Sequence, residues 1–163
     1  MTKIAEGKKL PDITDHLALA TTRGNARLAD FRGHQLVIYF YPKDDTPGCT
    51  VEGRDFSAAH TEFLKADTQV IGVSRDNLAS HDKFAKKHGL SIALVSDSDE
   101  TVCRAFDVIK EKNMYGKKVM GIERSTFLID AQGVVRRCWR GVKVPGHVQE
   151  VLRAAQSLRA SGA

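Results

Sequence analysis

The sequence predicts an α/β domain of three layers, in which a central mixed β-sheet lies between layers of helices. Apolar runs of strand length alternate with helical segments along most of the chain, as they do in three-layer α/β domains. Two strand segments near the end follow each other directly, which makes part of the sheet antiparallel. With 163 residues, 42% of them hydrophobic and 28% charged, we expect a single domain spanning residues 1–163.

The first half of the chain begins with a hairpin and continues with alternating strands and helices. Short apolar stretches on both sides of Arg23-Gly24-Asn25 predict an N-terminal β-hairpin. The continuous apolar run Leu36–Tyr41 predicts a strand buried on both faces. Apolar residues at helical spacing predict a helix from about Pro47 to Lys65. The elements expected next are strands at Gln69–Val73 and Ala93–Val95, a helix at Asn77–His88 and a helix that begins at Asp99.

The second half begins with a polar segment, Lys110–Gly121, which is flanked by glycine and predicts a long loop. Strands at Ser125–Ile129 and Val134–Arg140, joined across Asp130–Gly133, predict a hairpin. Pro145 precedes a final helix. Its predicted apolar stripe consists of Val148, Leu152, Ala155 and Leu158.

Three widely spaced cysteines, Cys49, Cys103 and Cys138, do not fit the disulfide framework of a small secreted domain. Residues 1–10 contain no apolar core of a signal peptide. The longest apolar run is far shorter than the ~20 residues that span a bilayer. We therefore expect a cytoplasmic protein that does not contact a membrane.

The charge pattern raises the question of nucleic-acid binding. The net charge is +5, and residues 134–163 contain six basic residues and one acidic residue. This segment has a single aromatic residue, Trp139, so it lacks the stacking platform of single-strand binders, and we expect a solvated surface. The six histidines are scattered and expected at the surface. Without metal-ligand spacing or a glycine-rich phosphate loop, we expect neither a metal nor a cofactor.

Cys49 stands where a buried strand gives way to a helix. The strand ends at Pro42, which cannot extend a ladder, and Thr46-Pro47 is a typical helix start. Cys49 is then the third helical residue, among free backbone N–H groups at the positive end of the helix dipole. Such a position favours the reactive thiolate form.

These residues alone leave two questions open. Cys49 could instead be a small buried residue with only a structural role. A thiolate would also need a nearby cation, for which Arg54 and Arg124 are the candidates, and sequence distance does not distinguish between them.

The segment around Cys49 resembles the active-site signature of the peroxiredoxins, Pro-x-x-x-Thr-x-x-Cys, matched by Pro42, Thr46 and Cys49. The longer string Tyr-Pro-Lys-Asp-Asp-Thr-Pro-Gly-Cys-Thr-x-Glu resembles the bacterioferritin-comigratory, or peroxiredoxin Q, subfamily. The similarity continues through residues 71–74, 94–97 and 117–130, and so covers nearly the whole chain. It implies a thioredoxin-like fold and a thiol-specific peroxidase that reduces hydrogen peroxide and organic hydroperoxides.

The resemblance also implies roles for individual residues. Cys49 would be the peroxidatic nucleophile, which becomes a sulfenic acid. Thr46 would hydrogen-bond the bound peroxide, and Pro42 would shield the thiolate from water. Arg124 would hold the thiolate and polarise the peroxide, while Glu52 would orient the arginines.

The sequence departs from the family pattern at the second, resolving cysteine. Many relatives carry it five residues after the first, where this chain has Arg54, or in the next helix, near Ala85. We therefore expect a one-cysteine mechanism completed by an external reductant, either thioredoxin or a glutaredoxin/glutathione-type thiol. Cys103, in an apolar helical setting, and Cys138, between two large side chains, remain alternative resolving thiols. Relatives of this kind imply a monomer or weak dimer.

Two alternative functions remain open. A redox sensor would pass oxidation from Cys49 to a partner protein without sustained peroxide turnover. A nucleic-acid-binding module would use the basic segment at residues 134–163. A disulfide oxidoreductase would need a second active-site cysteine, which this sequence lacks.

Overall fold

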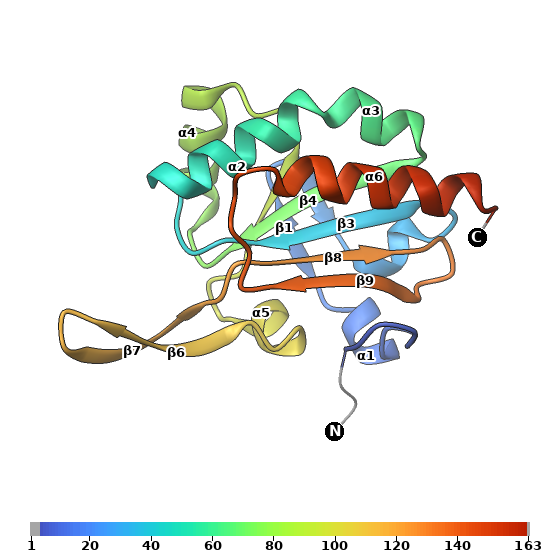
Figure 1. The fold of residues 1–163 in the computed structure, drawn as a ribbon. Coiled ribbons are helices and arrows are strands. Elements are labelled where there is room, and N and C mark those ends of the chain that lie inside the picture. The colour runs from blue at the N-terminus through green and yellow to red at the C-terminus, as the bar shows by residue number, and fades with distance from the viewer. Residues whose placement is uncertain (1–3, 163) are drawn as a thin grey trace.

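The computed structural model describes residues 4–162 and places one sheet between two helical layers (Figure 1). Within these residues, the large sheet has seven strands in the order β2-β1-β5-β4-β3-β8-β9. Strands β3, β4 and β5 pair in parallel, and the other neighbours pair antiparallel. The mixed sheet with helices on both faces agrees with the predicted architecture. Residues 1–3, which begin the segment considered as a signal peptide, and residue 163 lie outside the described residues.

The elements have the following bounds. The strands of the large sheet are β1 Leu19–Thr21, β2 Gly24–Ala26, β3 Gln35–Phe40, β4 Thr68–Ser74, β5 Ala93–Ser96, β8 Ser125–Ile129 and β9 Val135–Arg140. A separate two-stranded sheet consists of β6 Ile109–Met114 and β7 Lys117–Ile122. The helices are α1 Asp12–Asp15, α2 Pro47–Ala58, α3 His60–Lys65, α4 Leu78–His88, α5 Thr101–Ala105 and α6 His147–Ala160, with a 3-10 helix η1 at Leu28–Phe31.

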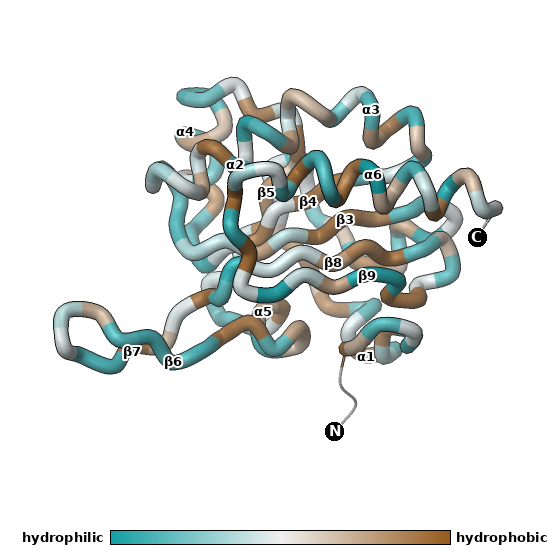
Figure 2. Tube along the Cα trace, viewed as in Figure 1, coloured by the Kyte–Doolittle hydropathy of each residue, from teal (hydrophilic) through white to brown (hydrophobic). Residues whose placement is uncertain are grey.

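Two hydrophobic clusters lie on opposite faces of the sheet. Strand β3 is buried throughout, and its alternate side chains belong to different clusters, Ile38 to one and Tyr39 to the other. Helices α2, α3, α4 and α6 cover the Tyr39 face, and α1 and α5 lie on the opposite side (Figure 1). Hydrophobic residues are concentrated along the central strands, whereas the helices show hydrophobic and hydrophilic residues in alternation (Figure 2).

The prediction of a loop at Lys110–Gly121 is wrong. These residues form most of the β6–β7 hairpin, which projects from the body of the molecule (Figure 1). The turn residues Tyr115 and Gly116 both have positive φ, at 54° and 80°, as a two-residue hairpin turn with matching twist requires. Most of its side chains are exposed, so the hairpin lacks the alternation of apolar and polar residues that identifies a half-buried strand.

The single helix predicted from Pro47 to Lys65 is instead two helices, α2 and α3. Ala59, between them, has φ −90° and ψ 0°, outside the helical region. The apolar face survives this irregularity, because Phe56 and Phe63 are both fully buried in the same cluster. Within the described residues, no helix combines the length and apolar character needed to cross a membrane.

Close packing between two central strands yields a test of this core. Tyr39 on β3 pairs with Gly72 on β4, and a Cβ at position 72 would lie 2.7 Å from the Tyr39 ring. Gly72→Ala should therefore lower the free energy of unfolding by about 1–3 kcal/mol, because the overpacked ring has to shift. Urea denaturation measures this change.

The Tyr39→Leu background is the matched control, because leucine removes most of the ring atoms next to Gly72. Gly72→Ala should cost less in that background. An equal cost in both backgrounds would contradict the packing argument.

Candidate active site

The start of α2 places Cys49 at the edge of the sheet. The chain leaves β3 at Phe40, passes through an irregular segment and enters α2 at Pro47. Thr46 occupies the N-cap position with extended backbone, so Cys49 is the third helical residue, as the sequence predicts. The first-turn N–H groups of a helix lack intrahelical partners and stabilise a negative charge placed beside them.

Thr46 does not cap the helix with its side chain. Its hydroxyl donates instead to the Lys43 carbonyl oxygen at 2.8 Å. The Thr46 oxygen can still accept a hydrogen bond, because a hydroxyl has two lone pairs in addition to its proton. Pro42 lies at the other end of this loop and is half-buried.

Arg124 connects the thiol to a buried carboxyl group. Its Nη2 lies 3.5 Å from Cys49 Sγ, and its Nη1 donates to Glu52 Oε1 at 2.7 Å. Cys49 is 2% exposed, and the side chains of Arg124 and Glu52 are 17% and 0% exposed. The guanidinium group therefore reaches the sulfur in a largely dehydrated setting, where its charge is weakly screened.

The electrostatics of this group depend on burial. Desolvation raises the pKa of Glu52 to about 7, against the opposing influence of the Arg124 charge. Burial would lower the pKa of Arg124, but the negative charges of Glu52 and Cys49 outweigh it and raise that pKa above its ordinary value. The second carboxyl oxygen of Glu52, Oε2, is buried without a hydrogen-bond partner among the described residues.

A glycine gives Arg124 its room. A Cβ at position 48 would lie 3.2 Å from Arg124 Nη2, tighter than an ordinary contact.

A second cation, Lys112 of β6, donates to the Ile122 carbonyl oxygen. Burial, followed by the positive charges of Arg124 and Arg75, lowers the pKa of Lys112. Lys112 is therefore close enough to Arg124 and Cys49 for their charges to act on it.

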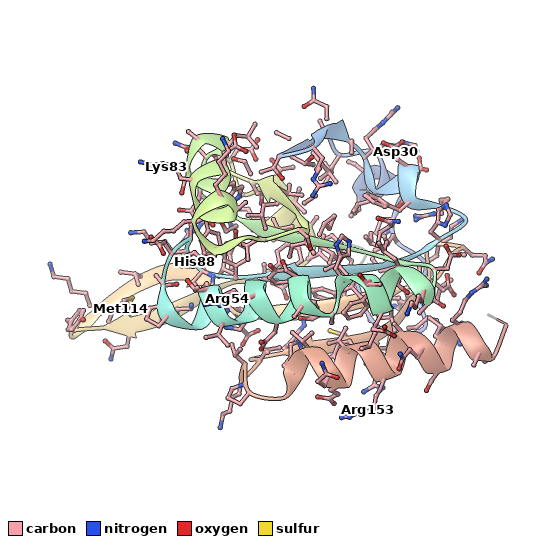
Figure 3. All side chains as sticks on the ribbon, turned by 90° about the horizontal axis from the view of Figure 1, so that it is seen from above. Asp30, Arg54, Lys83, His88, Met114 and Arg153 are labelled. Carbon is pink, nitrogen blue, oxygen red and sulfur yellow. The ribbon has the colours of Figure 1, made fainter. Side chains whose placement is uncertain are left out.

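The two positions at which the family pattern led us to look for a resolving cysteine carry other residues. Arg54 is exposed on the outer surface of α2 (Figure 3), and Ala85 is half-buried on α4. Of the two arginines that sequence distance could not distinguish, Arg124 is the one in contact with Cys49.

The three cysteines are free thiols, and the sheet separates Cys49 from the other two. Cys49 packs in the cluster on the α2 face, whereas Cys103 and Cys138 belong to the cluster on the opposite face. Cys103 is 0% exposed, and burial together with Asp97 raises its pKa strongly. Burial also raises the pKa of Cys138, despite the opposing charge of Arg140.

The expectation that all histidines lie at the surface is wrong for His81 and His147. His81 is 0% exposed, and its ring contacts Asp44 and the Val95 carbonyl oxygen. His147 is 4% exposed, and its Nε2 lies 2.8 Å from Thr126 Oγ1. Helical spacing offered a signal, because each histidine lies one turn from a buried apolar residue on its own helix.

One group of side chains has the composition of a metal site. Asp44, Asp76 and His81 place one possible ligand atom each within 4.8 Å of one another. Their hydrogen bonds already engage these atoms, since His81 Nδ1 bonds Asp44 and Asp76 Oδ2 accepts from the Asp44 backbone and the Ser74 hydroxyl. The geometry therefore explains the cluster without an ion.

The family assignment follows from comparison with known proteins. The sequence profile of the AhpC/TSA family matches residues 7–138. Peroxiredoxin Bcp of Xanthomonas campestris pv. campestris is 57% identical over 150 residues, which cover 91% of this chain and 94% of that protein. The chain belongs to the peroxiredoxin family. Peroxiredoxin Bcp of Bacillus subtilis is 46% identical and covers 93% of this chain and 95% of its own length.

Solved structures confirm the predicted thioredoxin-like peroxiredoxin fold. A peroxiredoxin Q from Xanthomonas campestris superimposes with a TM-score of 0.89 at 55% identity, covering 94% of this chain and 98% of its own. A cysteine-to-serine mutant of Xylella fastidiosa PrxQ gives a TM-score of 0.91 at 44% identity over 100% of both chains. The resemblance to the bacterioferritin-comigratory, or peroxiredoxin Q, subfamily is likewise confirmed.

The raised pKa of Glu52 makes its contribution to stability depend on pH. The folded protein holds the Glu52 proton up to about pH 7, whereas the ordinary value is 4.5. The folded state therefore binds more protons than the unfolded state in this window, and stability falls as pH rises. Relative to Glu52→Gln, the wild-type free energy of unfolding should fall by on the order of 2 kcal/mol between pH 4.5 and pH 7.

Chemical denaturation across this pH range measures the difference. Glu62→Gln, which makes the same substitution at an exposed position on α3, is the matched control. A wild-type free energy of unfolding that rises with pH relative to that of Glu52→Gln would contradict the assignment.

Proposed function

We propose that this peroxiredoxin is a one-cysteine peroxidase that reduces hydrogen peroxide and organic hydroperoxides with Cys49 as the nucleophile. The observation that carries the proposal is the 3.5 Å contact between Arg124 Nη2 and Cys49 Sγ at the first turn of α2. A helix N-terminus and a guanidinium group then act on the same sulfur. Both favour the thiolate, which is the nucleophilic form of cysteine.

In the first step, the Cys49 thiolate attacks the distal oxygen of the hydroperoxide. A sulfur–oxygen bond forms as the oxygen–oxygen bond breaks, and the leaving oxygen departs with the electron pair. Proton uptake turns the leaving oxygen into water or an alcohol, and Cys49 is left as a sulfenic acid. The sulfur is oxidised and the peroxide reduced, so the step balances without a further oxidant or reductant.

The neighbouring groups stabilise charge as it moves from sulfur to the leaving oxygen. Arg124 is placed to polarise the peroxide, and the buried Glu52 fixes the orientation of its guanidinium group. A preorganised donor of this kind raises the reaction rate by about 10²–10³-fold. Thr46, whose own proton is directed to Lys43, can accept the peroxide O–H, and Pro42 covers the approach of water.

The second step requires a thiol from outside the chain. Cys103 and Cys138 pack on the opposite face of the sheet from Cys49, so neither is placed to form a disulfide with it. The sulfenic acid would condense with one external thiol, releasing water and forming a mixed disulfide. A second external thiol would then release reduced Cys49 and a disulfide of the reductant. Thioredoxin or a glutaredoxin/glutathione-type thiol supplies this chemistry.

A relative supports the substrate class. One solved structure, 54% identical with a TM-score of 0.89 over 95% of this chain and 99% of its own, is described in terms of the alkyl peroxide reduction activity of the Xanthomonas campestris bacterioferritin comigratory protein. We further propose that the protein is cytoplasmic, that residues 1–163 form a single domain, and that it is a monomer or weak dimer.

Cysteine substitutions test both the nucleophile and the one-cysteine route. Cys49→Ser should abolish peroxide consumption with a thiol reductant, because serine is not ionised at neutral pH. Cys103→Ala and Cys138→Ala should keep turnover, because neither thiol lies on the Cys49 face of the sheet. Many equivalents of peroxide should be consumed per protein, which distinguishes a peroxidase from a redox sensor.

Peptide mapping after one equivalent of peroxide provides the complementary measurement. Cys49 sulfenic acid, or its mixed disulfide with the added thiol, is the expected product. A dominant Cys49–Cys103 or Cys49–Cys138 disulfide would reject the one-cysteine mechanism.

A further inference from the structure

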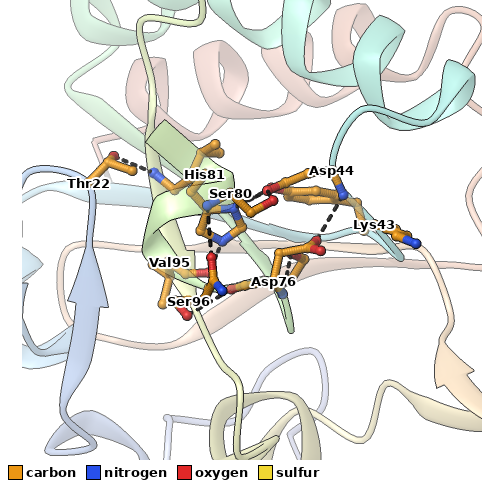
Figure 4. Close-up of polar contacts among 12 residues, drawn as sticks. Thr22, Lys43, Asp44, Asp76, Ser80, His81, Val95 and Ser96 are labelled. Atoms are coloured by element: carbon orange, nitrogen blue, oxygen red, sulfur yellow. Dashed lines mark hydrogen bonds and ion pairs between the residues drawn. The ribbon is translucent and has the colours of Figure 1, made fainter. Parts of the chain in front are cut away.

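A buried polar network centred on Asp44 joins helix α4 to the loop that precedes Cys49. Figure 4 shows Asp44 beside Ser80 and His81 of α4, with Asp76 below them. Asp44 is 7% exposed and lies midway between Pro42 and Thr46, two residues of the proposed peroxide site. The network is thus connected to the catalytic loop at its centre.

His81 is the innermost member of this network. It lies within α4 and is 0% exposed. Its Nδ1 is 2.7 Å from Asp44 Oδ2, and its Nε2 is 2.9 Å from the Val95 carbonyl oxygen of β5. The ring therefore spans the space between the sheet and the catalytic loop.

Hydrogen bonds from several side chains converge on the Asp44 carboxylate. A backbone carbonyl only accepts, so His81 Nε2 carries a proton. Asp44 also accepts from the Tyr41 hydroxyl at 2.6 Å and from the Ser80 hydroxyl at 2.8 Å. Burial would raise the pKa of Asp44, but its hydrogen bonds from His81, Tyr41 and Ser80 hold that pKa below its ordinary value. The Asp44 carboxylate therefore has three side-chain partners, the His81 ring and the Tyr41 and Ser80 hydroxyls.

Other charged and titratable groups face the ring from each neighbouring element. The Tyr41 hydroxyl, just past β3, lies 3.4 Å from His81 Nδ1. Asp76, after β4, has a carboxyl oxygen within 4.8 Å of the ligand atoms of His81 and Asp44, and it accepts the Asp44 backbone N–H at 2.8 Å. Both the backbone and the side chain of Asp44 are therefore fixed.

The following loop residue is held by the same helix. Asp45 has a left-handed backbone, with φ of 60°, and its carboxylate contacts Lys87 Nζ at 2.7 Å and His88 Nε2 at 2.8 Å. Helix α4 thus holds two consecutive residues of the six-residue loop between β3 and α2, and the strained backbone at Asp45 has side-chain support.

We propose that His81 is a positioning residue for the peroxidase reaction, acting through Asp44 to hold the loop that carries Pro42 and Thr46 against Cys49. This inference rests on the proposed function of Cys49. His81 itself touches no reacting atom. Its effect on the rate of peroxide reduction is indirect. The Thr46 oxygen and the Pro42 ring assist the reaction only when the loop holds them in the correct position relative to the sulfur.

Two substitutions of His81 test its two hydrogen bonds separately. In His81→Asn the side-chain amide can replace the Nδ1 donor toward Asp44, and in His81→Gln it can replace the Nε2 donor toward Val95. The reduced proteins are mixed with cumene hydroperoxide in a single turnover, and the rate of Cys49 oxidation is measured. The rate of Cys49 alkylation by iodoacetamide is measured in parallel, because alkylation needs the sulfur but not the peroxide-binding loop.

The expected result is a fall of about 10–100-fold in the peroxide rate of His81→Gln, with no matching fall in alkylation, and partial recovery in His81→Asn. The matched control is His34→Gln, at an exposed histidine whose Nδ1 lies 2.6 Å from Asp67 Oδ1. It should leave the peroxide rate unchanged.

An unchanged peroxide rate in His81→Gln, or equal falls in the peroxide and alkylation rates, would overturn the inference. If neither His81 variant folds, Ser80→Ala removes one hydrogen bond to the same carboxylate and should lower the peroxide rate selectively. A wild-type protein that consumes no peroxide would instead reject the proposed function, so the two failures are distinguishable.

Discussion

The contact between the Arg124 guanidinium group and the Cys49 sulfur is the interaction on which the account of this protein depends. The two residues are 75 positions apart, and antiparallel pairing of β3 with β8 brings them together. Phe40, at the end of β3, pairs with Ser125, at the start of β8, so the residues just outside these strands share one edge of the sheet. The absence of a side chain at Gly48 lets the guanidinium group approach the first turn of α2.

Burial makes this contact effective and also makes it costly. Taking charged groups out of water carries a large desolvation penalty, which the geometry offsets only when each charge is paired. The Glu52–Arg124–Cys49 chain supplies such partners at the sulfur, and the Asp44–His81 contact supplies one for the loop that precedes α2. Both networks connect the start of α2 to distant segments, so the first turn is held by tertiary contacts in addition to helix propensity.

Much of the fold could be predicted because buried strands and helices leave a recognisable pattern of apolar residues in the sequence. The run Leu36–Tyr41 and the Thr46-Pro47 helix start identified the strand and helix that carry Cys49. The β6–β7 hairpin escaped prediction because its exposed side chains show no alternation. The Arg124 contact could not be deduced from spacing, since it depends on strand pairing and register, and only the family resemblance indicated it. His81 was missed because its partners, Asp44 and Val95, come from other elements.

The most direct test of the central contact is the single-turnover rate of Cys49 oxidation by hydrogen peroxide when the guanidinium group is removed. Arg124→Met should be made in the Glu52→Gln background, so that no buried carboxylate loses its partner, and compared with Glu52→Gln alone. We expect the rate to be about 10²–10³-fold lower, with the fold intact by circular dichroism. An unchanged rate would contradict it, because the sulfur would then react without the charge placed beside it.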